Sequence, residues 1–311
     1  MPENNKNCDQ NMVNNEVISD KNTNHVEELL KKLTEDLDDI MSSKNQVSTR
    51  NRIATGFKEL NQILFGFYNG DLNIIASRPG IGKTFFALTL FSKIIRRGVN
   101  SLYISFDKNE MDLMKYYISI KAGFNSQLLE NGNLSVQDYT KFVHWFCETS
   151  EIKNIHLKSF FNASLIELKD FIKEKVSNDN ISIVFIDYLH MIVPSLTCAN
   201  RWEQISEISR SLKSMAMEFR IPFIVLCPFH ININEDTPEI NDLTEYSTIE
   251  FNADRIMILY ENKKIKQKDV LIENTDIKPV SLFVSKNRRG ETVTLDFMFN
   301  YKYRIIEVIK N

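Results

Sequence analysis

Apolar residues along the chain fall into short β-rich runs, and the early runs are separated by segments with helical periodicity. The β-rich runs cover residues 72–76, 101–106, 182–187, 223–227, 255–260, 281–285, 292–297 and 304–309. The segments with helical periodicity cover residues 84–97, 110–122, 135–149, 164–176 and 202–220. Strands that alternate with helices and are then followed by strands alone predict an α/β fold. We expect a mostly parallel, doubly wound sheet with antiparallel C-terminal strands.

Segments of different composition predict the domain organisation. Residues 1–24 are rich in Asn and poor in large apolar side chains, so we expect a disordered tail that cannot offset the entropy of ordering. Residues 25–51 are predicted to be a linker helix over 25–41 and a polar linker. The apolar stripe of this helix would pack on its own domain or on a neighbouring subunit, and the sequence favours neither. Residues 52–311 are predicted to form the α/β domain.

The overall composition is typical of a soluble globular protein. Hydrophobic residues make up 43% and charged residues 25% of the chain, and the net charge is −3. A nucleic acid would therefore have to bind at a local cluster of Lys and Arg. The four Cys form no CxxC pair, the N-terminus has no apolar signal-peptide core, and the longest apolar run, 181–193, is too short to span a bilayer. We expect a cytoplasmic protein without a membrane partner.

A glycine-containing loop follows the run 72–76 and precedes a helix. Its residues are Ser77, Arg78, Pro79, Gly80, Ile81, Gly82, Lys83 and Thr84. Backbone N–H groups of such a loop and of the helix N-terminus point at an anion, and the helix dipole adds partial positive charge. Lys83 would reach the β- and γ-phosphates of ATP, and the Thr84 hydroxyl would bind Mg²⁺. The full pattern GxxxxGK[ST] begins with Gly, where this chain has Ser77.

A carboxylate at the end of another apolar run suits the same site. The run 182–187 ends in Asp187. An aspartate in this position holds Mg²⁺ in phosphate-loop proteins, often through water. Many buried strands also end in Asp at a turn, so the assignment depends on the loop at 77–84. Thr84 and Asp187 are the predicted metal ligands, and ATP and Mg²⁺ are the predicted cofactors.

Several stretches go beyond a generic phosphate loop. They are residues 55–84, 186–192 (IDYLHMI), 200–201, 207–226, 242–260 and 286–290 (KNRRG). In this order they resemble the motor domain of the DnaB-type replicative DNA helicases. The resemblance implies a RecA-like P-loop fold assembled as a ring, usually a hexamer, with ATP between subunits. It also implies that Lys286 and Arg288 reach the γ-phosphate of the adjacent subunit; the alternative is a solvated basic hairpin turn.

The sequence departs from the family at two positions that act in hydrolysis. The family places a Glu after the second strand, where this chain has Asp107, whose reach is about 1.5 Å shorter. Asp107 is still the expected water-orienting residue, with Glu110 as a substitute and capping of the next helix as its alternative role. The family's Ser-Gln-Leu sensor is replaced by Cys227-Pro228-Phe229, and proline offers no polar side chain. His230 is the nearest polar replacement.

A third departure concerns DNA. No Lys or Arg lies between Arg220 and Arg255, and the stretch is acidic. The family's channel loops, which hold the phosphodiester backbone, fall in this stretch, so binding of single-stranded DNA at residues 230–250 is doubtful. The other basic candidates are Arg201, Arg210, Lys213 and the lysines within 263–268.

These observations predict an ATP-dependent DNA helicase or translocase subunit that acts in DNA replication. The expected catalytic residues are Lys83, Asp107, Lys286 and Arg288. The expected partners are further copies of the chain, single-stranded DNA and other replication proteins. The alternative is a degenerate helicase-like ATP-binding protein that regulates or assembles with a replicative helicase. A recombinase- or clock-type ATPase is disfavoured by the matches at 207–226 and 286–290, and residues 1–51 are too short for the family's separate N-terminal domain.

Overall fold

The computed structural model describes residues 27–35, 51–195, 200–228, 247–262 and 276–309. The chain divides into two compact units, Met1–Arg52 and Ile53–Asn311. In the first unit, residues 27–35 form a helix with three half-exposed leucines, Leu29, Leu30 and Leu33. The predicted tail and the rest of the predicted helix lie outside the described residues, as does most of the predicted linker.

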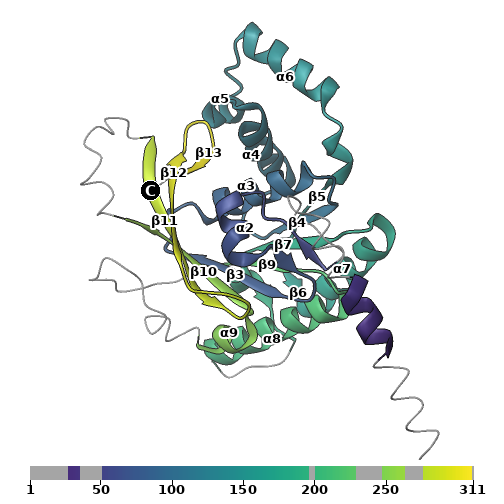
Figure 1. Ribbon diagram of the computed structural model, residues 1–311. Coiled ribbons are helices and arrows are strands. Elements are labelled where there is room, and N and C mark those ends of the chain that lie inside the picture. Colours follow the sequence, from purple (N-terminus) through teal and green to yellow (C-terminus); the bar gives the residue numbers. More distant parts are fainter. Residues whose placement is uncertain (1–26, 36–50, 196–199, 229–246, 263–275, 310–311) are drawn as a thin grey trace, which may run out of the picture. The chain divides into compact units, whose positions relative to one another are not determined.

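A nine-stranded sheet forms the centre of the described part of the second unit (Figure 1). In spatial order its strands are β13 (Ile305–Val308), β12 (Thr294–Asn300), β11 (Ile277–Asn287), β10 (Arg255–Glu261), β3 (Leu72–Ser77), β9 (Phe223–Pro228), β7 (Ile183–Asp187), β4 (Ser101–Ser105) and β5 (Ile155–Ser159). Neighbours from β10 to β5 pair in parallel, and neighbours from β10 to β13 pair antiparallel. The predicted fold class is confirmed, although β5 was not predicted.

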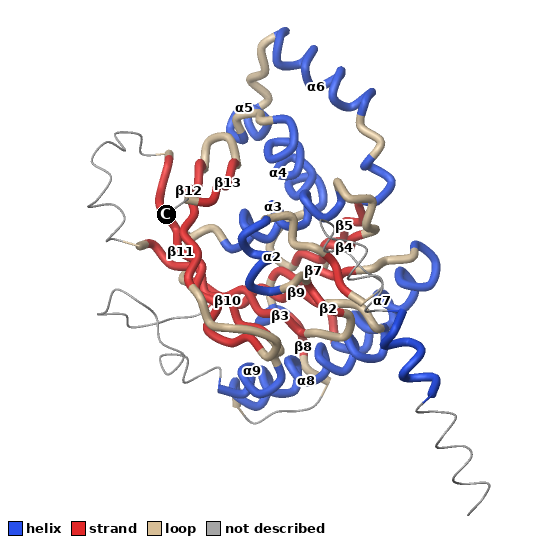
Figure 2. Tube along the Cα trace, in the orientation of Figure 1, coloured by secondary structure: helices blue, strands red, loops and turns tan. Residues whose placement is uncertain are grey.

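Helices cover both faces of the sheet, which is why its central strands are apolar on both sides (Figure 2). One face is covered by α2 (Lys58–Leu64), α3 (Lys83–Ile95) and α4 (Glu110–Ala122). The other face is covered by α7 (Leu165–Asp179), α8 (Arg201–Phe219) and α9 (Ser247–Asn252). In β3, Ile74 and Ala76 pack into the α7–α9 core and Ile75 packs into the α2–α4 core. This alternation decides which face each strand residue reaches.

The remaining elements are short or peripheral. They are β1 (Arg52–Ile53), β2 (Phe67–Tyr68), β6 (Ala163–Ser164), β8 (Ile192–Val193), α5 (Ser126–Asn131), α6 (Val136–Glu148) and the 3₁₀ turns Glu151–Asn154 and Leu189–Met191. Helix α6 has no buried residue, and Figure 1 shows it projecting from the sheet and its covering helices. Across the described ranges, no helix combines the length and the apolar character that a bilayer crossing needs.

Candidate nucleotide-binding site

The loop between β3 and α3 lies at the carboxyl end of a central parallel strand. Its glycines, Gly80 and Gly82, have φ angles of 82° and 102°, which residues with a Cβ rarely adopt. Gly82 is also the N-cap of α3, and a Cβ there would lie 3.3 Å from Phe299. The first turn of α3 carries no acidic residue. The loop therefore presents helix N-terminal amides without a competing carboxylate, which suits a phosphate group.

Lys83 folds back over the same loop. Its Nζ donates hydrogen bonds to the Ser77 carbonyl at 3.0 Å, the Ser77 hydroxyl at 3.1 Å and the Arg78 carbonyl at 3.4 Å. Burial lowers the pKa of Lys83, and the nearby Asp187 charge opposes this shift. The Ser77 hydroxyl in turn donates to the Arg78 carbonyl at 2.7 Å. Ser77, the departure from the glycine pattern, thus braces the lysine inside the loop.

The other loop residues expected at the nucleotide differ in burial. Arg78, Pro79 and Gly80 are exposed, whereas Ile81 is half-buried. The Ile81 carbonyl accepts a hydrogen bond of 3.0 Å from the Tyr301 hydroxyl. The loop is therefore open to solvent at residues 78–80, and Tyr301 supports it at Ile81.

Asp187 ends β7 directly beside the start of α3. Its Oδ2 accepts hydrogen bonds from the Thr84 hydroxyl at 2.8 Å and the Tyr103 hydroxyl at 2.9 Å. Its Oδ1 is buried and has no hydrogen-bond partner within the described part of the chain. Burial raises the pKa of Asp187 to about 6, although both hydroxyls and Lys83 act in the opposite direction. The structure thus brings Thr84 and Asp187 together, as the predicted metal site requires.

This geometry fits Mg²⁺ better than a metal held by protein alone. No three His, Cys, Asp or Glu side chains gather as a metal site in the described ranges. Mg²⁺ usually takes one or two carboxylates and completes its coordination with water and substrate phosphates. The bare Oδ1 of Asp187, next to the Thr84 hydroxyl and the N-terminus of α3, offers that incomplete set of ligands.

Asp107 lies two residues beyond β4 and close to Asp187. The backbone N–H of Phe106 donates to the Asp187 carbonyl at 2.7 Å. The Tyr188 side chain forms a hydrogen bond with the Asp107 carboxylate, and Lys108 lies 3.8 Å from it. Asp107 therefore lies next to Asp187, the predicted Mg²⁺ ligand, on the loop that follows β4.

The two alternatives considered for this loop are not supported. Asn109 is the N-cap of α4 and accepts from the Asp112 N–H at 2.8 Å, so the alternative role of Asp107 as a cap is wrong. Glu110 accepts a hydrogen bond from the Ser159 N–H at 3.0 Å and lies 3.8 Å from Lys158. Because Glu110 is bound to the edge strand β5, Asp107 is the carboxylate of this loop that remains beside Asp187.

The departure from the family's sensor lies beside the phosphate loop. Pro228 ends β9 and pairs in register with Ser77, the last residue of β3. Proline at this point has no N–H and no polar side chain. Burial raises the pKa of the preceding Cys227 thiol to about 12, so it does not supply a reactive group. Phe229 and His230 lie outside the described residues.

Lys286 and Arg288 lie near the amino end of β3, whereas the phosphate loop follows the carboxyl end of this strand. The strand register aligns Asn73 at the start of β3 with Arg255 and then with Asn287, whereas Ser77 at the end of β3 aligns with Leu259. Lys286 donates to the Glu250 carbonyl, and burial lowers its pKa. Arg288 donates to the Phe251 carbonyl at 3.0 Å and to Asp254 Oδ1 at 3.4 Å. The structure does not bring this pair together with Lys83.

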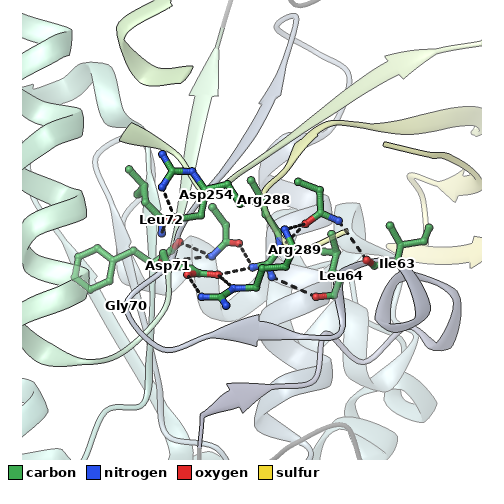
Figure 3. A network of polar contacts seen from close by, with 12 residues as sticks. Ile63, Leu64, Gly70, Asp71, Leu72, Asp254, Arg288 and Arg289 are labelled. Carbon is green, nitrogen blue, oxygen red and sulfur yellow. Dashed lines mark hydrogen bonds and ion pairs between the residues drawn. The ribbon is translucent and has the colours of Figure 1, made fainter. Parts of the chain in front are cut away.

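A polar network holds the KNRRG turn against the start of β3 (Figure 3). Asp254 Oδ2 accepts from the Leu72 N–H at 2.8 Å and from Lys213 at 2.6 Å, while its Oδ1 faces Arg288. Asp71 accepts from the fully buried Arg255 at 2.8 Å and from Arg289 at 3.3 Å. This network was not predicted from the sequence, although Asp71 and Asp254, each directly before an apolar strand, were a signal for it.

The two basic or acidic segments expected to decide DNA binding are largely outside the described residues. The acidic segment 230–250 is described only from residue 247 onward, and the lysines within 263–268 lie entirely outside the described residues. Of the basic candidates on α8, Lys213 is engaged by Asp254 and by the Gly70 carbonyl at 2.8 Å. Arg201 donates to the His190 carbonyl at 2.8 Å. Lys213 therefore serves the polar network, whereas Arg210 is exposed on the same helix.

The comparison with known proteins agrees with this fold. Residues 52–307 match the family described as the DnaB-like helicase C terminal domain. The chain belongs to this family. The predicted resemblance and the predicted RecA-like fold are thereby confirmed.

Its relatives include helicases longer than this chain. It is 32% identical to a probable replicative DNA helicase of Trieres chinensis, over 81% of this chain and 56% of the relative. It is 28% identical to the replicative DNA helicase DnaC of Bacillus subtilis, over 93% of this chain and 63% of the relative. A solved DnaB-like replicative helicase superimposes with a TM-score of 0.74 at 25% identity, over 89% of this chain and 65% of that chain. The chain therefore spans less than two thirds of each of these helicases.

The raised pKa of Asp187 predicts a pH-dependent cost in stability. The folded state holds this proton up to about pH 6, whereas an ordinary aspartate loses it near 3.8. Stability from this group is therefore fully present below 3.8 and is lost as the pH rises towards 6. In EDTA, Asp187→Asn should be more stable than the unsubstituted protein at pH 7.5, on the order of 1 to 3 kcal/mol. The difference should shrink towards pH 4.

Urea unfolding of both proteins across this pH range measures the effect. Because the two proteins differ only at residue 187, the difference in stability between them isolates the effect of this carboxylate. A difference that stays constant from pH 4 to 7.5 would contradict the raised pKa.

Proposed function

We propose that this chain is the ATP-hydrolysing motor part of a DnaB-type replicative DNA helicase. The observation that carries the proposal is the hydrogen bond between Thr84 and Asp187, made beside a lysine-braced phosphate loop in a member of this family. The names of its relatives support replicative DNA unwinding as the use of that ATP.

In this proposal the phosphate chain of ATP lies on the loop at the N-terminus of α3. Lys83 turns from the Ser77 and Arg78 carbonyls to the β- and γ-phosphates, exchanging three loop contacts for a charged partner. Burial lowers the pKa of Lys83, and a phosphate would oppose this shift because it stabilises the charged amine.

Thr84 and Asp187 are the proposed protein groups for Mg²⁺, which when bound neutralises charge that develops on the phosphates. Asp107 is the proposed residue that orients the attacking water, since it lies beside Asp187 on the loop after β4. The Tyr188 hydrogen bond restrains the Asp107 side chain, which is 43% exposed and so reachable by water.

The proposed assembly is a hexameric ring of copies of this chain. Lys286 and Arg288 lie at the opposite end of β3 from the phosphate loop, so they suit a triphosphate held by a neighbouring copy. The helix at 27–35, with its half-exposed leucines, suits a contact with such a neighbour. Single-stranded DNA and other replication proteins are the proposed partners.

The experiment that tests the proposal is ATP turnover with and without single-stranded DNA. We expect DNA-stimulated turnover that Lys83→Ala lowers by ~100-fold or more, because the phosphate loop loses its charged donor. Lys58→Ala, which removes an exposed lysine of α2, is the matched control and should keep turnover. Turnover that ignores both DNA and Lys83→Ala would contradict the proposal.

A second candidate function is a helicase-like ATP-binding protein that assembles with or regulates a replicative helicase. The observations that favour it are the short Asp107 side chain and Pro228, which stands beside Ser77 where the family has its sensor. Both changes affect hydrolysis and leave the phosphate loop intact. ATP binding without DNA-stimulated turnover would favour this candidate.

A substitution at Asp107 tests whether this residue limits the rate of ATP hydrolysis. Asp107→Glu should raise kcat, by up to ~100-fold, because a shift of about 1 Å towards the attacking water has effects of this size. KM for ATP should stay unchanged, and steady-state kinetics measures both constants. Glu110→Gln is the control, since Glu110 is bound to β5. No change or a loss of kcat in Asp107→Glu would remove Asp107 from the catalytic set.

Arg288 lies at the opposite end of β3 from the phosphate loop. We therefore predict that subunits with different substitutions complement one another in ATP turnover. Arg288→Ala should retain ATP binding and lose about 10³-fold in turnover, as for other arginine fingers. Mixing Arg288→Ala with Lys83→Ala subunits should restore part of the turnover, because some interfaces then combine an intact loop with an intact Arg288. The doubly substituted chain, mixed with Lys83→Ala, should restore none. Loss of ATP binding in isolated Arg288→Ala subunits would contradict action between subunits.

A further inference from the structure

The fully buried Tyr103 is a polar residue that the proposed mechanism does not use. It lies in the middle of β4, within an aromatic cluster in which its ring is stacked on Phe185 and meets Phe91 edge to face. In the sequence it is one member of an apolar run. Its hydroxyl nevertheless donates a hydrogen bond of 2.9 Å to Asp187 Oδ2.

The sheet register explains why this hydroxyl reaches Asp187. Tyr103 pairs with Phe185 on the parallel neighbour β7, and Ser105 pairs with Asp187. Residues two apart on a strand point to the same face, so Asp187 lies on the α3 side of the sheet with Phe185 and Tyr103. A phenol extends far enough along this face to reach the diagonal neighbour.

The two oxygens of Asp187 have unequal surroundings. Oδ2 accepts from both the Thr84 and the Tyr103 hydroxyls, at 2.8 and 2.9 Å, and Oδ1 has no partner within the described residues. Two donors on one oxygen fix the rotation of the carboxylate and leave the other oxygen bare. The Thr84 hydroxyl is itself a proposed ligand of the cation, so its bond to Oδ2 is exchanged when the cation binds. Tyr103 then remains as a donor to Oδ2.

We propose that Tyr103 is a positioning residue for the metal carboxylate: its hydroxyl holds Asp187 Oδ2 so that Oδ1 is presented to Mg²⁺. This inference rests on the proposed function, because it takes Asp187 as the carboxylate that binds Mg²⁺. It assigns a role in cation affinity to a side chain that touches neither nucleotide nor metal.

Tyr103→Phe removes one oxygen atom and keeps the aromatic packing. The affinity of the protein for a non-hydrolysable ATP analogue is measured by calorimetry over a series of Mg²⁺ concentrations, and again in EDTA. We expect the Mg²⁺ concentration for half-maximal effect to rise by ~10-fold, the size expected for one lost hydrogen bond to a charged group. Affinity in EDTA should be unchanged, because the phosphate loop is intact.

Tyr117→Phe is the matched control. Tyr117 is also fully buried, also meets Phe91 edge to face, and also donates to a carboxylate, that of Glu151 at 3.3 Å. Glu151 lies outside the site, so Tyr117→Phe should keep the Mg²⁺ dependence. Thermal melting of both variants measures the general cost of losing a buried hydroxyl. If Tyr103 had a purely structural role, Tyr103→Phe would lower the melting temperature of the protein and leave the Mg²⁺ dependence unchanged.

The outcomes separate this inference from the proposed function. An unchanged Mg²⁺ dependence in Tyr103→Phe, or an equal shift in Tyr103→Phe and Tyr117→Phe, would overturn the positioning role. Asp187→Asn serves as the reference. It should raise the Mg²⁺ concentration for half-maximal effect more than Tyr103→Phe does. If Asp187→Asn leaves that dependence intact, the assignment of Asp187 in the proposed function fails, and the role of Tyr103 fails with it.

Discussion

A carboxylate buried at the end of a central strand is the interaction on which the rest of the site depends. Asp187 is almost fully enclosed, and a buried carboxylate is unfavourable unless it is hydrogen-bonded or paired. Two hydroxyls satisfy one of its oxygens, and the other stays bare. The parallel arrangement of β4 and β7, with α3 packed above them, brings these groups together. The fold therefore maintains a site that a divalent cation and a phosphate chain would complete.

Strand β3 connects this site with the polar network at the opposite end of the sheet. Its last residue, Ser77, braces Lys83, and its first residue, Leu72, donates to Asp254. Asp254 also faces Arg288, so the group proposed to act on a neighbour's nucleotide is anchored to the strand that carries the chain's own phosphate loop. In the proposed ring, one short strand would thus be shared by the two halves of a site formed between neighbouring subunits. This arrangement suits a ring in which each interface uses one end of each subunit.

Two of the departures from the family concern residues expected to act in hydrolysis. The phosphate loop and the metal carboxylate have the parts that binding needs, whereas Asp107 and Pro228 replace parts that act in hydrolysis. Pro228 is the last residue of β9, and Asp107 lies on the loop that follows β4. We therefore expect ATP binding and ATP turnover to be separable in this chain, so the two proposed functions lead to different outcomes in the same assay.

The sequence by itself determined the strand cores, the glycine loop and the helix after it, because each depends on local periodicity and backbone preference. It missed β5, since Ile155–Ser159 is a half-buried edge strand that alternates apolar and polar residues over a short length. Only the tertiary structure decided that Tyr103 contacts Asp187 and that Arg255 contacts Asp71. These residues are far apart in the chain, and strand order and register, which local patterns do not encode, bring them together.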